Sequence, residues 1–210
     1  MAGKYRIILV GGSSHVGKST LARALAKQFG WSCRSTDSLA RHPGRPWQAK
    51  PETVPEHVAE HYLSLSVEEL ITDVHRHYKD NVWRLVEDIV ASHSTALSTD
   101  GLILEGSAIL PELAVTLISD NIATLWLTAS NELFERRINS TSRYDTKSHR
   151  EKKMIDKFLA RTCLYNERMM DAVRRLGLVS INVENAANVD ELTDTCLSIL
   201  EKMDRKIKAV

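Results

Sequence analysis

The fold is decided by the stretch Ile7-Ile8-Leu9-Val10-Gly11-Gly12-Ser13-Ser14-His15-Val16-Gly17-Lys18-Ser19-Thr20, close to the start of the chain. Its second half satisfies the pattern G-x-x-x-x-G-K-[ST] without a gap, between an apolar strand and a helix. Glycines in such a turn let the backbone curl until successive N–H groups point inward at phosphate oxygens, and the following helix adds the positive end of its dipole. The residues predicted to bind a phosphorylated ligand are Gly12, Ser13, Ser14, His15, Val16, Gly17, Lys18, Ser19 and Thr20.

Side chains of this turn have distinct predicted roles. Lys18 is expected to reach the β- and γ-phosphates as a point charge. Ser19 offers its hydroxyl to Mg²⁺, and Thr20 is placed to bond the α-phosphate. His15 occupies a variable position of the motif, from which it can tune the turn.

Strand and helix patterns alternate five times along the chain. Short apolar or β-branched runs predict strands at 5–10, 32–36, 102–104, 122–127 and 178–183. Helical spacing or capping signals predict helices at 18–29, after Ser66, around 82–90, near Pro111, after Ser130, at 151–176 and after Asn188. Such alternation is typical of a parallel sheet with helices on both faces. We therefore expect residues 1–210 to form one three-layer α/β domain.

Composition restricts the class of protein further. The net charge of +1, with 43% hydrophobic and 26% charged residues, is ordinary for a globular domain and argues against a dedicated nucleic-acid or membrane-surface protein. Cys33, Cys163 and Cys196 are few and widely spaced, which fits a reducing compartment. No apolar run has the length of a secretory signal or a membrane span. We expect a cytoplasmic monomer or homodimer that binds neither nucleic acid nor membrane.

Two acidic residues follow predicted strands, at the carboxyl edge where ligands bind in parallel sheets. Asp37 ends the strand at 32–36, and Glu105 follows the strand at 102–104. Glu105 lies where a carboxylate can hold a Mg²⁺-bound water, so Ser19 and Glu105 are the predicted metal site. Each acid also has a structural alternative, since Asp37 can cap a helix and Glu105 can be an ordinary strand-end carboxylate.

The rest of the sequence separates classes of phosphate-loop protein. A GTPase would carry N-K-x-D after its fourth strand, whereas 127–132 reads Leu-Thr-Ala-Ser-Asn-Glu, and motor or AAA+-type ATPases need a longer chain. A small kinase needs an acid after its second strand, a helical acceptor-binding insertion and an arginine-bearing lid. Asp37 supplies the acid, residues from about 39 to 98 form the insertion, and residues from about 136 to 152 form the lid. Four of the five prolines lie within 42–55, which predicts a loop or hinge there.

Arginines in and after the lid are candidates to neutralise charge on a transferring phosphoryl group. Arg136, Arg137 and Arg143 lie in the lid, and adjacent helical residues point about 100° apart, so only one of the first two can face the site directly. The polar segment 139–150 lacks apolar periodicity and is predicted to be a mobile loop. Arg161 and Arg168 share one face of the following helix. One of them can close on phosphate, or they can be solvated, and the sequence does not decide between these alternatives.

These features resemble the adenylate-kinase-like group of phosphate-loop kinases, which includes nucleotide, shikimate, gluconate and 2-phosphoglycerate kinases. Ser35-Thr36-Asp37 and Leu104-Glu105-Gly106-Ser107-Ala108-Ile109-Leu110-Pro111 are most similar to the 2-phosphoglycerate-kinase-like branch, where a strand ending in Glu-Gly precedes an apolar, proline-containing turn. The resemblance implies a five-stranded parallel sheet in the order 2-3-1-4-5, ATP as donor and Mg²⁺ as cofactor. It also implies an acceptor held between Asp37, Glu105 and the insertion.

The chain departs from this pattern at the acceptor. The paired arginines of a nucleoside-monophosphate site are not found, since Arg41 and Arg45 lie in the proline-rich loop, and Asp37 is not part of the D-x-D pair of shikimate-type kinases. We expect ATP-dependent transfer of the γ-phosphoryl group to a small hydroxyl- or phosphate-bearing metabolite of the nucleotide, sugar-acid or phosphoglycerate type. The alternative is an ATP-binding regulatory switch or slow NTPase. The predicted catalytic residues are Lys18, Asp37, Glu105, Arg136 and Arg143, with Asp37 and Glu105 competing as the group that orients or deprotonates the acceptor hydroxyl.

Two other patterns are set aside. His57 and His61 belong to an H-x-x-E-H sequence, which places both imidazoles on one helix face as in zinc peptidases, but no third ligand is obvious. The tryptophans are not interleaved with basic residues, which disfavours base stacking. Trp47, beside Arg45, can line an acceptor pocket, although plain packing is the simpler expectation.

Overall fold

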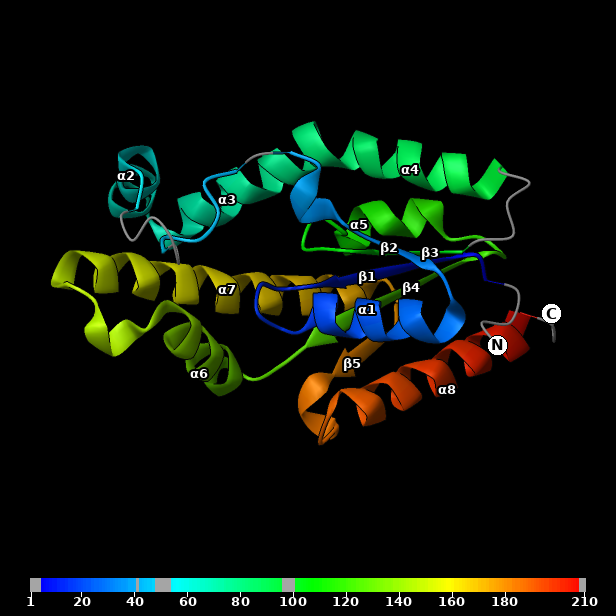
Figure 1. Cartoon of the computed structure of the whole chain (residues 1–210). Coiled ribbons are helices and arrows are strands. Elements are labelled where there is room, and N and C mark those ends of the chain that lie inside the picture. The colour runs from blue at the N-terminus through cyan, green and yellow to red at the C-terminus, as the bar shows by residue number, and fades with distance from the viewer. Residues whose placement is uncertain (1–4, 41, 48–53, 96–100, 208–210) are drawn as a thin grey trace.

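The protein is described from a computed structural model, which covers residues 5–40, 42–47, 54–95 and 101–207. Its centre is a sheet of five parallel strands, β1 (Ile7–Gly12), β2 (Ser32–Ser35), β3 (Leu102–Glu105), β4 (Ile122–Thr128) and β5 (Ser180–Asn182). The strands are ordered β2-β3-β1-β4-β5, which confirms the predicted 2-3-1-4-5 arrangement (Figure 1). Arg41 and the segment 48–53, with Pro51, lie outside the described residues.

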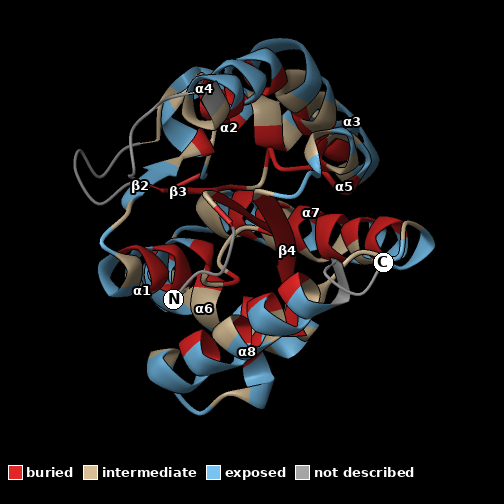
Figure 2. Ribbon diagram, turned by 90° about the vertical axis from the view of Figure 1, so that its right-hand side faces the viewer, coloured by how far each residue is buried: buried red, intermediate tan, exposed pale blue. Residues whose placement is uncertain are grey.

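Helices cover both faces of this sheet. They are α1 (Lys18–Phe29), α2 (Glu56–Ser64), α3 (Val67–His77), α4 (Trp83–Thr95), α5 (Pro111–Ala114), α6 (Asn131–Ser142), α7 (His149–Arg175) and α8 (Val189–Ile207). Figure 2 shows the sheet, with β3 and β4 buried and the edge strand β2 exposed, between α2, α3, α4 and α5 on one side and α1, α6 and α8 on the other. None of the described helices is long and apolar enough to cross a membrane.

Side chains along β1 point alternately to the two faces of the sheet, which explains why helices cover both faces. Ile8 and Val10 belong to the apolar cluster that includes α1 and α8, whereas Ile7 and Leu9 belong to the cluster that includes α4 and α5. All four side chains are fully buried, as expected for a central parallel strand covered on both faces. The strand therefore fixes the position of the turn that follows it.

Three helices, α2, α3 and α4, occupy most of the predicted insertion between β2 and β3. The helix α3 begins at a capping box in which Ser66 and Glu69 exchange hydrogen bonds, as the sequence predicts. A five-residue π-helical turn, Tyr78–Val82, joins α3 to α4.

The prediction of a mobile loop at 139–150 is wrong. The helix α6 continues to Ser142, a 3-10 turn covers Tyr144–Thr146, and α7 begins at His149. This segment lacks apolar periodicity, and its helices are delimited by local caps instead. Arg143 ends α6 in a left-handed conformation (φ 55°), and Ser148 caps α7 in a capping box with Glu151. The predicted lid segment is thus helical at both ends.

Candidate active site

The turn after β1 has the backbone conformation that its glycines allow. Gly12 and Gly17 have φ values of 146° and 110°, in the region that favours glycine. A Cβ on Gly12 would lie 2.9 Å from the carbonyl oxygen of Leu127 and 2.9 Å from Val16 Cγ1. The turn therefore tolerates no larger residue at Gly12, and the helix α1 starts directly after it at Lys18.

Lys18 is buried at the centre of the site, with 7% of its surface exposed. Its ammonium donates hydrogen bonds to the Ser13 carbonyl (2.8 Å) and to Ser107 Oγ (3.2 Å). Burial lowers the pKa of Lys18, while the nearby carboxylates of Glu105 and Asp37 act in the opposite direction. A phosphate in the turn would supply the anionic partner that a buried ammonium needs.

Ser19 and Glu105 form the predicted metal-binding pair. Ser19 Oγ donates a hydrogen bond of 2.9 Å to Glu105 Oε1, and the carboxyl residue is 3% exposed at the end of β3. A hydroxyl beside a carboxylate is a set of hard oxygen donors, which suits Mg²⁺. These residues therefore fit the ion that the motif implies.

Asp37 lies in a 3-10 turn, Thr36–Ser38, that follows β2. The cap of this turn is Ser35, whose Oγ accepts a hydrogen bond from the Asp37 N–H, so the alternative role of Asp37 as the cap is wrong. Gly106, with φ 156°, allows close packing against this turn, because a Cβ on it would lie 1.7 Å from Thr36 Oγ1. The exposed Asp37 carboxylate is left available to a ligand.

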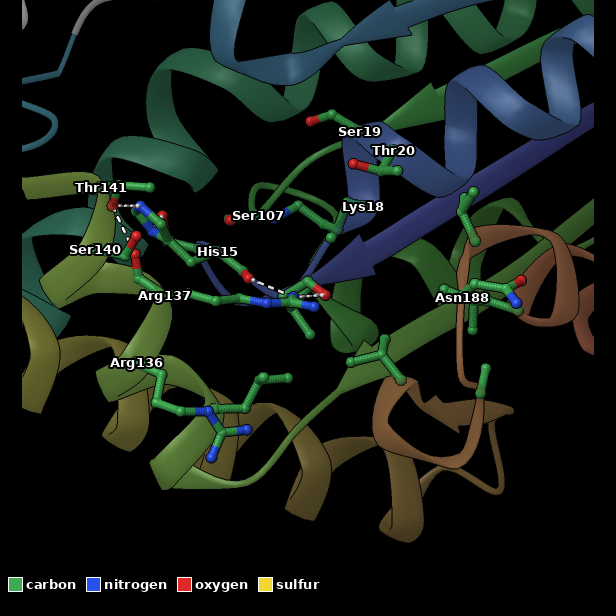
Figure 3. A pocket seen from close by; sticks show the side chains of 18 of the residues that line it. His15, Lys18, Ser19, Thr20, Ser107, Arg136, Arg137, Ser140, Thr141 and Asn188 are labelled. Atoms are coloured by element: carbon green, nitrogen blue, oxygen red, sulfur yellow. Dashed lines mark hydrogen bonds between the residues drawn. The ribbon is translucent and has the colours of Figure 1, made fainter.

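Two cavities meet at the turn. The large cavity, of about 760 Å³, is lined by the turn, by α6 and by the start of α8 (Figure 3). The side cavity, of about 180 Å³, extends toward α3 and α7, and its lining includes His42, Tyr78 and Arg161. Four residues line both cavities, namely Ser14, Asp37, Arg45 and Ser107. Ligands bound in the two cavities would thus come together beside these four residues, of which Asp37 is the only carboxylate.

Of the predicted lid arginines, Arg137 contacts the turn. Its Nη1 donates hydrogen bonds of 2.9 Å to the carbonyls of His15 and Val16, and burial lowers its pKa. Arg136 also lines the large cavity, but in Figure 3 its exposed side chain points away from the turn. The arginine of the pair that faces the turn is therefore Arg137, and not Arg136, which the sequence analysis named as catalytic. Arg143 is exposed and lines neither cavity. The structure therefore brings Arg137, rather than Arg143, to the turn.

The two arginines of α7 have different surroundings. Arg168 is exposed and forms a 2.5 Å ion pair with Glu68. Arg161 is 9% exposed, and its guanidinium carbon lies 4.7 Å and 5.5 Å from the ring centres of Phe158 and Tyr62. Its Nη1 is buried and has no hydrogen-bond partner among the described residues. A buried cation of this kind, in the wall of the side cavity, is available to an anionic ligand.

His15 connects the turn to neighbouring segments. Its backbone is left-handed (φ 63°), and its ring lies 5.6 Å from the ring of Trp47 and 5.7 Å from that of Phe158. Burial, followed by the charges of Arg45, Lys18 and Arg137, lowers the pKa of His15 to about 4, so its imidazole is neutral at pH 7. The sequence analysis did not predict the packing of the His15 ring. It also did not name Ser107 as a site residue, although its position two residues after Glu105 could have indicated it.

Comparisons with known proteins agree with this geometry at the level of the fold. Neither the protein-family models nor the curated protein sequences give a match. Among solved structures, a gluconokinase from Sinorhizobium meliloti 1021 is similar with a TM-score of 0.55 and 16% identity, covering 96% of this chain and 94% of that one. A shikimate kinase from Aquifex aeolicus vf5 is similar with a TM-score of 0.54 and 14% identity, covering 93% of this chain and 96% of that one. A thymidylate kinase from Candida albicans has a TM-score of 0.51 and 16% identity, covering 94% of this chain and 92% of that one. The chain therefore shares the fold of these three enzymes, and at such identities the likeness concerns the fold and not the activity or substrate.

Proposed function

We propose that the protein is an ATP-dependent phosphotransferase that moves the γ-phosphoryl group to a small, hydroxylated acid. The observation that carries this proposal is the position of Asp37, which lines both the large cavity beside Lys18 and the side cavity beside Arg161. A phosphoryl donor and a hydroxyl acceptor held in these two cavities would meet at this carboxylate.

The large cavity is the proposed ATP site. The backbone of the turn would surround the phosphates, and Lys18, already buried beside Ser107, would neutralise their charge. Ser19 and Glu105 would hold Mg²⁺, which when bound screens charge on the phosphate oxygens. Arg137 stiffens the turn through its two carbonyl contacts, and Arg136 would reach the transferring group only after turning inward.

Asp37 is the proposed residue that orients or deprotonates the acceptor hydroxyl. It is exposed to both cavities, whereas Glu105 is buried and accepts the hydrogen bond from Ser19. A base must reach the proton that it removes, so this difference favours Asp37 over Glu105. Phosphoryl transfer depends mainly on positioning and charge neutralisation, which assigns Asp37 a larger role in orientation than in proton removal.

The acceptor is proposed to carry a carboxylate or phosphate beside its hydroxyl. Arg161 is a buried cation in the wall of the side cavity, and Arg45 borders both cavities. The side cavity is much smaller than the large one, which favours a compact acid over a nucleotide. The similarity of 104–111 to the 2-phosphoglycerate-kinase-like branch supports the same class of acceptor.

A panel of acceptors tests this proposal. ADP formation from ATP and Mg²⁺ is measured with sugar acids, glycerate and phosphoglycerates, and with nucleosides and nucleoside monophosphates as the contrasting set. We expect stimulation by a hydroxylated acid in the wild type and acceptor-dependent turnover about 10²–10⁴-fold lower in Asp37→Asn, although this variant still binds ATP. Tight ATP binding without stimulation by any acceptor would support the regulatory-switch alternative instead.

A further inference from the structure

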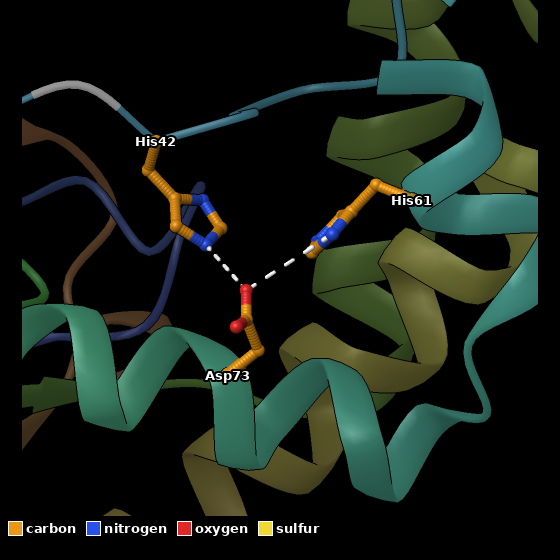
Figure 4. A group of neighbouring side chains, drawn as sticks. All are labelled: His42, His61 and Asp73. Atoms are coloured by element: carbon orange, nitrogen blue, oxygen red, sulfur yellow. Dashed lines mark ion pairs between the residues drawn. The ribbon is translucent and has the colours of Figure 1, made fainter. Parts of the chain in front are cut away.

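Three side chains from three separate segments meet beside the side cavity (Figure 4). His42 comes from the loop after β2, His61 from α2 and Asp73 from α3. His42 Nε2 lies 3.4 Å and His61 Nδ1 lies 4.0 Å from the same carboxylate oxygen, Asp73 Oδ2. The side chains of His42, His61 and Asp73 are 13%, 11% and 27% exposed, so the cluster is largely shielded from solvent.

Both imidazoles are largely buried and face the same carboxylate oxygen. Burial, followed by the charges of Arg161, His77 and His61 and opposed by Asp73, lowers the pKa of His42 to about 4. Burial also lowers the pKa of His61, against the effect of Asp73. His42 Nε2, the atom that faces Asp73, is buried and has no hydrogen-bond partner among the described residues. In His61 the nitrogen that faces Asp73 is Nδ1, and its other nitrogen, Nε2, is buried without such a partner. Two imidazoles facing one carboxylate form a donor set that borderline transition metals prefer.

We propose that His42, His61 and Asp73 bind a divalent transition-metal ion of the zinc class. Zn–N and Zn–O bonds of about 2.0–2.2 Å separate the ligand atoms of a tetrahedral ion by roughly 3.3–3.5 Å. The His42–Asp73 distance already fits, the His61–Asp73 distance is wider by about half an ångström, and the three ligand atoms lie within 4.8 Å of one another. Small rotations of the imidazole rings would close this difference.

The neighbouring groups shape this site. Arg76 pairs with Asp73 Oδ1 and leaves Oδ2 to face the histidines. The ring of His77 lies 4.9 Å from that of His42, on the helix of Asp73 and one turn further along, where it is the nearest candidate for a fourth ligand. The Gly44 N–H donates a long hydrogen bond of 3.4 Å to His42 Nδ1, so an ion on Nε2 would move the ring proton to Nδ1 and displace this contact.

The site would fasten the proline-rich loop to the helices of the insertion. This loop carries Arg45, which lines both cavities, and Trp47, whose ring packs against His15. The hydrogen bond from the Tyr62 hydroxyl to the Gly44 carbonyl also holds the loop to α2. The ligand set differs from the H-x-x-E-H pair, because His57 and Glu60 are exposed and only His61 belongs to the cluster.

Calorimetry of the full-length, chelator-treated protein with Zn²⁺, in the absence of nucleotide, tests this proposal. We expect one ion per chain in the wild type and in His57→Ala, the matched control on the same helix, and at least about tenfold weaker binding in His42→Ala, His61→Ala and Asp73→Asn. Substitution with Co²⁺ reports the ligands independently, since the visible absorption of four-coordinate Co²⁺ should be lost in the same three variants.

His42→Gln and His61→Gln keep the size of the side chain and serve where the alanine variant does not fold, as checked by circular dichroism. Absence of Zn²⁺ binding by the wild type would overturn the proposal and would identify the cluster as a simple His–Asp contact. Zn²⁺ binding of equal affinity in the wild type and in the cluster variants would also overturn it, because the ion would then bind elsewhere.

Discussion

Replacing Arg161 with methionine tests whether this arginine binds the acceptor or stabilises the fold. The guanidinium is 9% exposed, contacts two aromatic rings, and has a buried Nη1 with no hydrogen-bond partner among the described residues. A hydrogen bond between charged groups contributes about 1.5–3 kcal/mol, so its loss should raise the KM for the acceptor by about 10- to 150-fold. The KM for ATP should remain close to that of the wild type, because the residue lines the side cavity.

The same substitution should not destabilise the free protein. An unpaired buried cation is costly to desolvate, whereas methionine is apolar and of similar length. Loss of the contacts with the rings, worth about 0.5–2 kcal/mol, is offset by this relief. We expect the Tm to stay within about 4 °C of the wild-type value or to rise.

Steady-state kinetics with the acceptor varied at saturating ATP, together with thermal unfolding, measure both effects. The control is Arg168→Met, seven residues further along α7, where the arginine is exposed and paired with Glu68. Stabilisation of the unliganded fold by inorganic phosphate or sulfate gives a second readout, which should weaken in Arg161→Met only. An acceptor KM that is equal in the two variants would refute the assignment of Arg161 as the anion-binding residue.

Further predictions concern the turn and the strand ends. Lys18→Ala should abolish detectable ATP binding by calorimetry, since no other cation is buried in the turn within the described part of the chain. Asp37→Asn should lower acceptor-dependent turnover by about 10²–10⁴-fold and leave the Kd for ATP unchanged, as separate kinetic and binding measurements would show. Gly106→Ala should destabilise the fold by about 1–3 kcal/mol in urea titrations, because its Cβ would collide with Thr36, and Thr36→Ala in the same chain should recover part of this loss. The low pKa of His15, about 4, means that its neutral form stabilises the fold fully above about pH 6.5 and that this contribution is lost as the pH falls toward 4. The Tm of His15→Gln should therefore fall less than that of the wild type between pH 6.5 and 4.

Local patterns in the sequence were sufficient for the turn and for most strands of the sheet, whereas the order of the strands came from the resemblance to phosphate-loop kinases. The turn motif, the apolar run at 7–10 and the helix at 18–29 depend on neighbouring residues, and the helix α1 begins and ends where its pattern predicts. The edge strand β2 is mostly exposed, which explains why its pattern is weak. The helical caps around Arg143 and Ser148 lie in a polar segment, so a reading based on periodicity assigned a loop to it.

Contacts over long sequence distances were not predictable in the same way. The pairing of Arg137 with the carbonyls of His15 and Val16 spans more than 120 residues, and adjacent arginines are equivalent in the sequence. The surroundings of Arg161 depend on rings from α2 and α7 that meet only in the fold. The same is true of His42, which no local spacing connects with His61.

Calorimetric titration of the folded protein with ATP in the presence of Mg²⁺ is the most direct test of the central claim, that the turn between β1 and α1 surrounds a polyphosphate. We expect saturable binding of one nucleotide per chain in the wild type, with the heat signal lost in Lys18→Ala although its circular dichroism spectrum is unchanged. Wild-type protein that is fully folded and binds neither ATP nor GTP under these conditions would contradict the account.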